Sequence, residues 1–361
     1  MIVDKNYEHI NVDSNFRVED PDIIFENKSI KKKICVISSK KIEDEIVLKL
    51  ENIYYCIRSD DIFRLEHFLK YCIPNVDYEF DWERLYPFNH YDSPYATKED
   101  IRNNAFFNDI DDFDGLNIDD QIFVSQLEEI KDNVEMFKYD LKVFGTKGVS
   151  ERRYRVKNGF YGFFDALILY TNIKKYKPKR IIEVGSGFST LVMLDTIEEL
   201  GLDTKITCIE PYPERLKKNL RYGDINRIEL IEKKLQNTDM RIFGSLSKDD
   251  LLFIDSSHVA KCGSDIQFLY FKILPNLNKN VKVHIHDIFK HFTYPDEWVV
   301  SGDAYNEGFI VRAMLMNNEK WKILFFTNYV TSSEKFDEHR IVWDYEKFGL
   351  YYGNSLWIEK V

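Results

Sequence analysis

The sequence predicts an α/β protein in which parallel strands form one doubly wound sheet with helices on both faces. The first observation is residues 180–190, Arg-Ile-Ile-Glu-Val-Gly-Ser-Gly-Phe-Ser-Thr, where a β-branched apolar run leads into a turn with two glycines and then into helix-forming sequence. The second is that strand-like and helix-like segments alternate after this turn. The third is that two later strands end in a carboxylate, at Glu210 and Asp255. Ligands bind such sheets at the carboxyl ends of the strands.

Seven strands are expected, and the last two have no clear helix between them. That pattern predicts an antiparallel pair at one edge of an otherwise parallel sheet. The expected strands are 180–184, 205–210, 227–232, 250–255, 282–288, 321–328 and 355–360. The spacing of apolar residues predicts helices at 118–144, 154–176, 191–200, 214–221, 263–277 and 305–316. Gly201 is expected to cap the third of these helices at its carboxyl end.

The first third of the chain carries a different pattern. Apolar, β-rich runs at 32–38 and 45–57 and a short amphipathic helix at 60–71 predict a small α+β accessory region over residues 1–115. Nothing in it resembles cofactor-binding sequence, and its role is open. Residues 116–361 are expected to form the α/β domain with its leading helices.

Composition limits the classes of protein that fit. Of the 361 residues, 44% are hydrophobic and 31% charged, so we expect a packed core. The net charge of -11 argues against a nucleic-acid partner or an anionic membrane surface. Five cysteines without C-x-x-C spacing indicate neither a disulfide framework nor a cysteine zinc site, and no apolar run is long enough for membrane insertion. A cytoplasmic protein is expected, and a homo-oligomer is compatible with the sequence.

The glycine turn is the first candidate ligand site. Gly185 and Gly187 carry no side chains, so backbone N–H groups can approach a ligand, and Ser189 or Thr190 can cap the helix that follows. A dinucleotide fingerprint requires a third small residue at position 190, where this chain has threonine. Glu183 would repel a pyrophosphate but can face an ammonium group. The turn therefore favours a ligand with a cationic amino-acid head over NAD.

Glu210 supports a nucleoside ligand at the same turn. Glu210 follows Gly187 by 210 − 187 = 23 positions. This is close to the roughly 20 residues expected between a glycine turn and the acid that hydrogen-bonds ribose hydroxyls. The aromatic segment before the turn is a second candidate. Tyr161 or a neighbouring ring is expected to cover the cofactor, to shape a substrate mouth, or to pack in the core.

A family resemblance follows from these residues. The run Glu183-Val184-Gly185-Ser186-Gly187 resembles motif I of class I S-adenosylmethionine (SAM) dependent methyltransferases, and residues from about 160 to 361 look like a whole Rossmann-like domain of that class. Residues 253–258, 263–265, 284–289 and 306–307 resemble a bacterial branch of small-molecule and surface-glycan O-methyltransferases. The resemblance implies that SAM binds at Glu183, Gly185, Ser186, Gly187, Glu210 and Asp255.

The resemblance also implies a catalytic edge. Metal-dependent relatives hold magnesium through an acid after the fourth strand and a pair after the fifth, where this chain has Asp255, His286 and Asp287. An imidazole ligand favours manganese or zinc over magnesium. The alternative is that no metal binds and that His286 and Asp287 hydrogen-bond loops or substrate. His258 and His286 are the candidate general bases, because imidazole titrates near neutral pH.

Together these observations predict a SAM-dependent O-methyltransferase. Its acceptor would be a hydroxyl of a small polar molecule, such as a sugar or a glycan intermediate of polysaccharide biosynthesis. Two alternatives remain open: an NAD-linked oxidoreductase on the same sheet, and a non-catalytic SAM-binding module in glycan assembly.

Overall fold

The computed structural model describes residues 2–3, 18–19, 95–96, 99–103, 113–134, 140–143, 152–342 and 353–361. The chain divides into two compact units, Met1–Ser93 and Pro94–Val361. In the first unit, β1 (Ile2–Val3) and β2 (Val18–Glu19) pair in parallel. The elements expected at 32–38, 45–57 and 60–71 lie outside the described residues. The division near residue 115 and the accessory role of the first region stay predictions.

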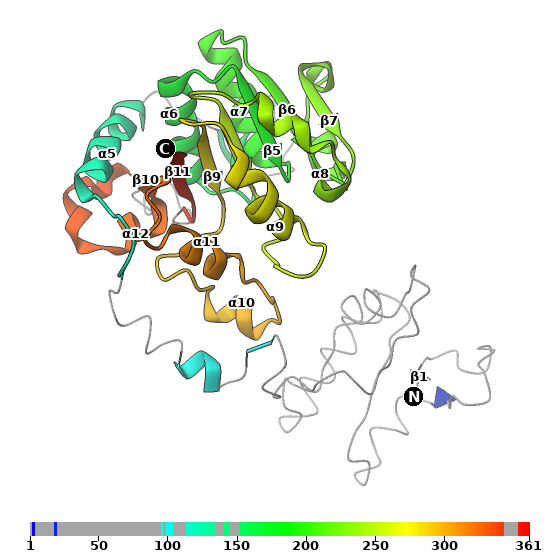
Figure 1. Ribbon diagram of the computed structural model, residues 1–361. Helices are drawn as coiled ribbons and strands as arrows, with labels where there is room; N and C mark the ends of the chain where they lie inside the picture. Colours follow the sequence, from blue (N-terminus) through cyan, green and yellow to red (C-terminus); the bar gives the residue numbers. More distant parts are fainter. Residues whose placement is uncertain are drawn as a thin grey trace. The chain divides into compact units, whose positions relative to one another are not determined.

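Seven strands of the second unit form one sheet in the order β10-β11-β9-β8-β5-β6-β7 (Figure 1). Strands β7, β6, β5, β8 and β9 are parallel neighbours, and β11 runs antiparallel to both β9 and β10. The predicted fold class is confirmed, including the antiparallel pair at one edge. The strands are β5 (Arg180–Val184), β6 (Lys205–Ile209), β7 (Ile228–Ile231), β8 (Leu251–Ile254), β9 (Lys282–Ile285), β10 (Trp321–Phe326) and β11 (Leu356–Lys360).

Helices connect the strands in the order expected for a doubly wound sheet. The α-helices are α5 (Asp120–Val134), α6 (Phe163–Tyr176), α7 (Phe188–Leu200), α8 (Glu214–Asn219), α9 (Asp265–Phe268), α10 (Asp296–Val300), α11 (Glu307–Leu315) and α12 (Thr327–Ser332). Shorter 3-10 turns are η4 (Asp224–Arg227), η5 (Leu235–Asn237), η6 (Met240–Ser245), η8 (Leu274–Asn276) and η9 (Glu334–Val342), and η7 (Leu269–Ile273) is a π turn. As predicted, Gly201 caps α7 in the left-handed conformation, with φ of 61°.

The expected helix at 118–144 is wrong in its second half. The helix α5 ends at Val134, and residues 140–143 form β3 (Asp140–Val143), which pairs in parallel with β4 (Arg155–Lys157). Asp-Leu-Lys-Val alternates polar and apolar residues, and a period of two suits a strand better than a helix. The region between β10 and β11 also differs from expectation, because α12 and η9 occupy it.

The expected helix at 154–176 begins only at Phe163, because Asn158 and Gly159 form a turn before it. The Asn158 Oδ1 atom accepts hydrogen bonds from the N–H groups of Phe160 and Tyr161, each at 2.8 Å. Gly159 has a φ of +76°, which favours glycine. This turn holds Phe160 at the surface and Tyr161 in the core.

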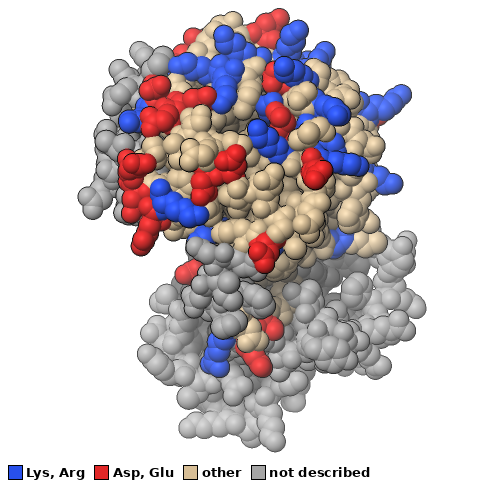
Figure 2. Space-filling model, turned by 60° about the vertical axis from the view of Figure 1, so that its left-hand side comes forward, with Lys and Arg blue, Asp and Glu red and all other residues tan. Residues whose placement is uncertain are grey.

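The core is built on the central strands. Every residue of β8 and β9 is buried, as expected for strands covered by helices on both faces. Lys282, the charged residue of β9, is buried as well, and it pairs with Asp249 at 3.0 Å and with Glu359. Within the described ranges, every helix is too short or too polar to cross a lipid bilayer. Figure 2 shows acidic and basic side chains interspersed over the face in view.

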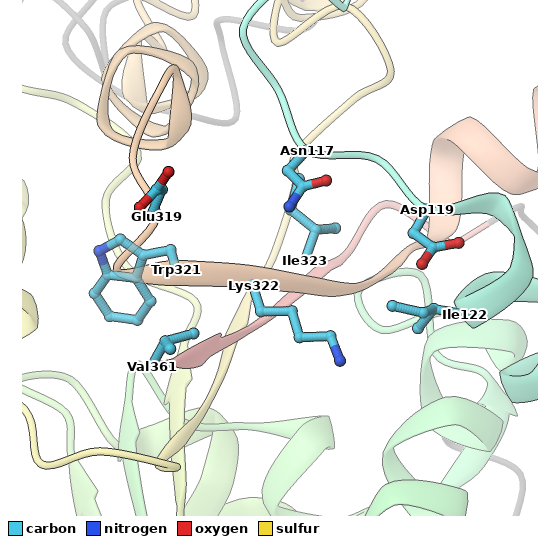
Figure 3. Close-up of a pocket in the computed structure, with 8 residues that line it drawn as sticks. All are labelled: Asn117, Asp119, Ile122, Glu319, Trp321, Lys322, Ile323 and Val361. Carbon is cyan, nitrogen blue, oxygen red and sulfur yellow. The ribbon is translucent and has the colours of Figure 1, made fainter.

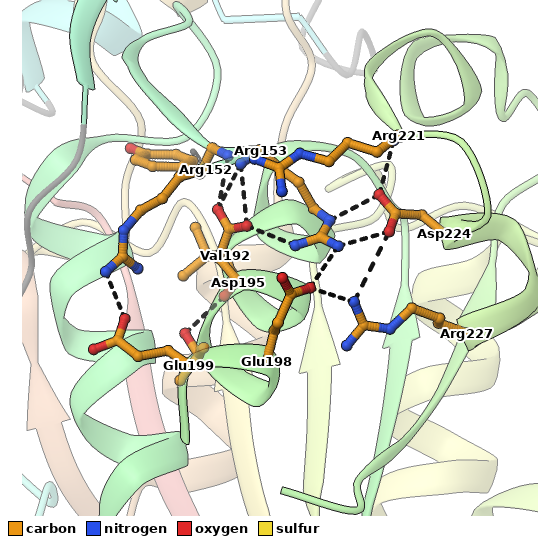
Figure 4. Close-up of polar contacts among 11 residues, drawn as sticks. Arg152, Arg153, Val192, Asp195, Glu198, Glu199, Arg221, Asp224 and Arg227 are labelled. Atoms are coloured by element: carbon orange, nitrogen blue, oxygen red, sulfur yellow. Dashed lines mark hydrogen bonds and ion pairs between the residues drawn. The ribbon is translucent and has the colours of Figure 1, made fainter. Parts of the chain in front are cut away.

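A buried ion network fixes the segment before β4 against α7 and η4 (Figure 4). Arg153, 8% exposed, donates from Nε and Nη2 to both carboxylate oxygens of Asp224, each at 2.7 Å. Its Nη1 donates to Asp195 at 2.9 Å, and Nη2 also donates to Glu198 at 2.7 Å. Asp195 accepts the N–H groups of Arg153 and Tyr154 as well. One guanidinium thereby neutralises two buried carboxylates, which would be costly to bury unpaired.

Candidate functional site

The carboxyl ends of β6, β5 and β8 meet at the glycine turn. The N–H of Gly185 donates to the carbonyl of Ile209 at 3.0 Å, and the N–H of Asp255 donates to the carbonyl of Val184 at 2.9 Å. Gly185 has a φ of +79°, and a Cβ at this position would lie 1.7 Å from the carbonyl oxygen of Asp255. Only glycine fits here, because any side chain would collide with the backbone of the next strand.

Glu183 lies inside this junction and is fully buried. Its two carboxylate oxygens accept hydrogen bonds from the hydroxyls of Ser189 and Thr190, each at 2.6 Å, and Cys208 Sγ lies 3.4 Å from one of them. Burial raises the pKa of Glu183 to about 7, although these hydrogen bonds lower it. The carboxylate therefore ties the end of β5 to the first turn of α7. Its contact with a cofactor's ammonium group stays a prediction.

Glu210 lies against the same turn. Its Oε2 accepts the N–H of Ser186 at 3.1 Å, and its Oε1 accepts the N–H of Tyr212 at 2.8 Å. The Ser186 hydroxyl is buried and has no hydrogen-bond partner among the residues that the structure describes. An orphaned polar atom of this kind calls for a ligand or a water. Ser186 and Glu210 thus form one polar group beside Gly187, and the contact of this group with a cofactor stays a prediction.

A second polar group lies where β8 and β9 end. These strands are parallel neighbours. The Nε2 atom of His258 lies 3.4 Å from Asp255 Oδ1 and 3.6 Å from Asp287 Oδ2. One potential ligand atom of each residue lies within 4.8 Å of the other two. Two carboxylates and an imidazole that converge in this way can hold a divalent cation.

The backbone and a buried acid hold His258 in this position. His258 and Asp287 have φ angles of 56° and 53°, which side-chain-bearing residues rarely adopt. His258 Nδ1 lies 2.7 Å from Oε2 of Glu307, and Oε1 of this fully buried residue accepts the Tyr270 hydroxyl at 2.6 Å. The carbonyl of His258 accepts the N–H groups of Asn306 and Glu307. Metal-binding histidines are typically oriented by a carboxylate on the second ring nitrogen in this manner.

The charges of the group are strongly coupled. Burial lowers the pKa of His258, but hydrogen bonds to Asp255 and Glu307 and the charges of Glu307 and Asp287 raise it well above its ordinary value. Burial raises the pKa of Asp255, but the charges of His286 and His258 and the His258 hydrogen bond bring it below its ordinary value. Burial keeps the pKa of Asp287 raised. The His258 ring therefore carries both protons at neutral pH unless a cation replaces one of them.

His286 lies beside this group and not within it. Its Nε2 is 3.7 Å from Asp287 Oδ1, its side chain is buried, and its ring centroid is 5.1 Å from that of Tyr161. Among the described residues, the group that could hold a metal ion thus contains His258, whereas the sequence analysis suggested His286 as the imidazole ligand. The sequence could not reveal this, because the choice depends on the positive φ of His258 and on Glu307, which is 49 positions away. His284 is a buried core residue stacked on Phe253, with ring centroids 3.9 Å apart.

Aromatic rings that the sequence analysis did not single out stand next to the polar group. The rings of Tyr294 and Tyr305 have centroids 5.4 Å apart, and Trp298 lies 5.7 Å from Tyr305. The His258 ring lies 5.5 Å from that of Tyr305. These residues come from the segment that follows β9 and includes α10 (Figure 1). The dense run of aromatic residues after the fifth strand is the sequence feature that could have predicted this cluster.

A separate hollow of about 410 Å³ lies at the opposite edge of the sheet (Figure 3). Trp321, which lines the hollow, pairs with Lys360, and Glu359 pairs with Lys282, the first residue of β9. The hollow therefore lies where the parallel strands begin. The lining residues are Asn117, Asp119, Ile122, Glu319, Trp321, Lys322, Ile323 and Val361. The hollow is therefore distinct from the carboxyl edge that carries the polar groups.

Comparison with known proteins identifies the region that holds the site. Residues 182–288 match the model of a family described as a methyltransferase domain. A protein of Archaeoglobus fulgidus described as uncharacterized is 28% identical over 173 residues, which make up 46% of this chain and 76% of that protein. The alignment with the SAH-bound methyltransferase PaMTH1 of Podospora anserina covers 74% of this chain and 98% of that one, at 17% identity and a TM-score of 0.38. The alignment with the O-methyltransferase TomG of Streptomyces achromogenes, in complex with SAM, covers 68% of this chain and 92% of that one, at 14% identity and a TM-score of 0.36.

The family match confirms the resemblance to class I SAM-dependent methyltransferases over residues 182–288. These residues run from β5 to the end of β9, so the glycine turn, Glu210 and the group of Asp255, His258 and Asp287 all lie inside the matched region. A SAM-dependent methyltransferase is the activity class that this match supports. The two solved structures, with TM-scores below 0.5, bear on no functional assignment.

The buried Glu183 predicts a pH dependence of stability. Its pKa rises from 4.5 to about 7 on folding, so between these values the folded chain holds a proton that the unfolded chain has lost. Stability therefore falls as pH rises from about 4.5 to about 7, by on the order of 3 kcal/mol from this residue. The Glu183→Gln variant should lack this contribution. The measurement is the free energy of unfolding in urea at pH 5 and pH 8 for both proteins, and equal pH dependence in the two would contradict the assignment.

Proposed function

We propose that this chain binds SAM at the β5–α7 turn and transfers its methyl group to a hydroxyl oxygen of a small polar acceptor, such as a sugar or a glycan intermediate. The observation that carries the proposal is that the glycine turn, Glu210 and Asp255 converge at one edge of the sheet within the region matched by the family model. The proposed contacts of the cofactor are Glu183, Gly185, Ser186, Gly187, Glu210 and Asp255.

Each part of the proposed cofactor contact has its own support. Glu210 already holds the turn through the N–H of Ser186, so its carboxylate is oriented toward the space where ribose hydroxyls would bind. The Ser186 hydroxyl is buried without a partner in the described part of the chain and can hydrogen-bond the cofactor. Asp255 is partly exposed and keeps its negative charge, which favours the cationic sulfonium and ammonium groups of SAM.

The reaction moves the methyl group from sulfur to oxygen. As the C–S bond breaks and the new C–O bond forms, the acceptor hydroxyl loses its proton and SAH is left. Positioning the oxygen in line with the methyl group supplies much of the rate, and a base or a metal supplies the alkoxide. His258, His286 and Asp287 are the proposed catalytic residues. His258 lies between Asp255 and Asp287 and is better placed than His286 to meet a hydroxyl bound there. It can act as the base only after it has given up one of its two ring protons, because its neighbours raise its pKa.

The same residues fit a divalent metal. Asp255, His258 and Asp287 would hold it, with Glu307 orienting the imidazole, and His286 would stand behind Asp287. Two carboxylates with one imidazole suit manganese or zinc better than magnesium. When bound, such an ion would lower the pKa of the acceptor hydroxyl.

Cytoplasmic location, the glycan pathway and a homo-oligomeric state are further parts of the proposal that rest on the sequence alone.

The Glu210→Ala variant tests the cofactor site. A lost hydrogen bond to a charged partner costs about 1.5 to 3 kcal/mol, so the variant should bind SAM roughly tenfold or more weakly in titration calorimetry. Glu214→Ala, which removes an exposed carboxylate from the neighbouring helix, is the matched control and should leave the affinity unchanged. If a folded Glu210→Ala protein binds SAM as tightly as the control, the ribose assignment is wrong.

Metal removal tests the catalytic group. With radiolabelled SAM and a panel of monosaccharides, nucleotide sugars and catechols as acceptors, chelation should abolish methyl transfer and Mn²⁺ should restore it, while SAM binding persists. Glu307→Gln should weaken Mn²⁺ binding about 10- to 100-fold, because it frees the His258 ring. Asp296→Asn, on the surface of α10, is the control. Activity that survives chelation but is lost in His258→Ala would replace the metal with a histidine base.

A further inference from the structure

An exposed aromatic ring and a cation stand beside the glycine turn. Phe160 is 60% exposed, and the guanidinium carbon of Arg215 lies 3.9 Å from the centroid of its ring. The Phe160 ring also stacks on Phe188, the first residue of α7, with centroids 5.8 Å apart and an interplanar angle of 12°. Three separate segments therefore meet here: the turn before α6, the start of α7, and α8.

The Phe160 ring is held in place rather than left on a loose loop. Oδ1 of Asn158 accepts the N–H groups of Phe160 and Tyr161, and the Asn158 amide donates to the carbonyls of Arg155 and Tyr161 at 2.7 and 2.9 Å. A side chain that is four times bonded to the backbone fixes the turn. Phe160 thus offers a rigid surface against which the Arg215 guanidinium is packed.

Arg215 extends over the turn itself. Its Cδ lies 3.8 Å from the position that a Cβ on Gly187 would occupy. Burial raises the pKa of Asp255, and the positive charge of Arg215 is among those that act against this rise. In the described part of the chain, Arg215 forms no ion pair with a carboxylate. An exposed guanidinium is therefore available at the end of the site where the amino-acid part of the cofactor would bind.

The charges of the site indicate which group of SAM the Arg215 guanidinium would bind. The methionine part of SAM carries a carboxylate as well as an ammonium group. Glu210 and Asp255 place carboxylates beside the turn, which attract the ammonium and sulfonium groups but repel the carboxylate of the cofactor. A cation is needed to hold that carboxylate, and a guanidinium binds carboxylates through paired hydrogen bonds.

We propose that Arg215 binds the carboxylate of the methionine part of SAM and that Phe160 positions the guanidinium, so that the pair closes over the amino-acid end of the cofactor. This inference rests on the proposed function, which places that end at the glycine turn. It makes Arg215 a specificity residue: the site would distinguish SAM and SAH from analogues that lack the carboxylate. The sequence analysis left open whether Tyr161 or a neighbouring ring covers the cofactor or packs in the core; Tyr161 is buried and Phe160 is the exposed neighbour.

Titration calorimetry with two ligands tests the assignment on the full-length protein. Decarboxylated SAM differs from SAM only in lacking the carboxylate. The wild-type protein should bind SAM roughly tenfold more tightly than decarboxylated SAM. In Arg215→Gln, SAM affinity should fall roughly tenfold while the affinity for decarboxylated SAM stays constant. Lys217→Gln, which removes a positive charge from the same helix, is the matched control and should preserve the wild-type ratio; its partner is Glu232, at 2.6 Å.

Phe160→Leu provides a second arm. Removing the aromatic face should weaken SAM about threefold and leave decarboxylated SAM unaffected, because the guanidinium loses its support but not its charge. Equal losses for both ligands in Arg215→Gln would overturn the carboxylate assignment, as would tighter binding of both, which would mean that Arg215 obstructs the site. If the wild-type protein binds decarboxylated SAM but does not prefer SAM, the Arg215 assignment fails and the proposed function stands. If it binds neither ligand, the proposed function fails and this inference with it.

Discussion

The close approach of Gly185 to the backbone of Asp255 is the constraint on which the site depends. A Cβ at position 185 would lie 1.7 Å from the carbonyl oxygen of Asp255, so the end of β5 can meet the end of β8 only if this residue is glycine. The N–H of Gly185 is meanwhile bonded to Ile209 in β6, and buried Glu183 accepts the hydroxyls of Ser189 and Thr190 in the first turn of α7. Three strand ends and one helix are thereby fixed at a single point.

The acids at this junction have different surroundings. Glu183 is buried and held by hydroxyls, whereas Glu210 and Asp255, which follow β6 and β8, are partly exposed. Asp287 follows β9, the next neighbour of β8, and meets His258 beside Asp255. The positive φ angles of His258 and Asp287 turn both side chains into one group, and Glu307 fixes the ring. These contacts are present without a ligand, and a site held in this way favours binding and catalysis by positioning.

Much of this could be predicted from the sequence because local patterns determine it. The glycine turn and the acid that follows β6 can be recognised from strand-like runs and their order, and the adjacency of β8 and β9 is inferred from the fold class that these runs predict. The helix starts were harder: Asn158-Gly159 is a turn signal inside an apolar pattern, and Asp140–Val143 follows a strand period in what resembled a helix. The choice of His258, the Arg153 network and the Phe160–Arg215 contact depend on residues distant in sequence, so no local pattern encodes them.

The central claim is that the turn after β5 is built for SAM rather than for a dinucleotide. Titration calorimetry of the full-length protein with SAM and with NAD, each at the same concentration and at neutral pH, tests it most directly. We predict saturable binding of SAM with one site per chain and no measurable heat with NAD. Binding of NAD without binding of SAM would contradict the claim and would favour an oxidoreductase on the same sheet.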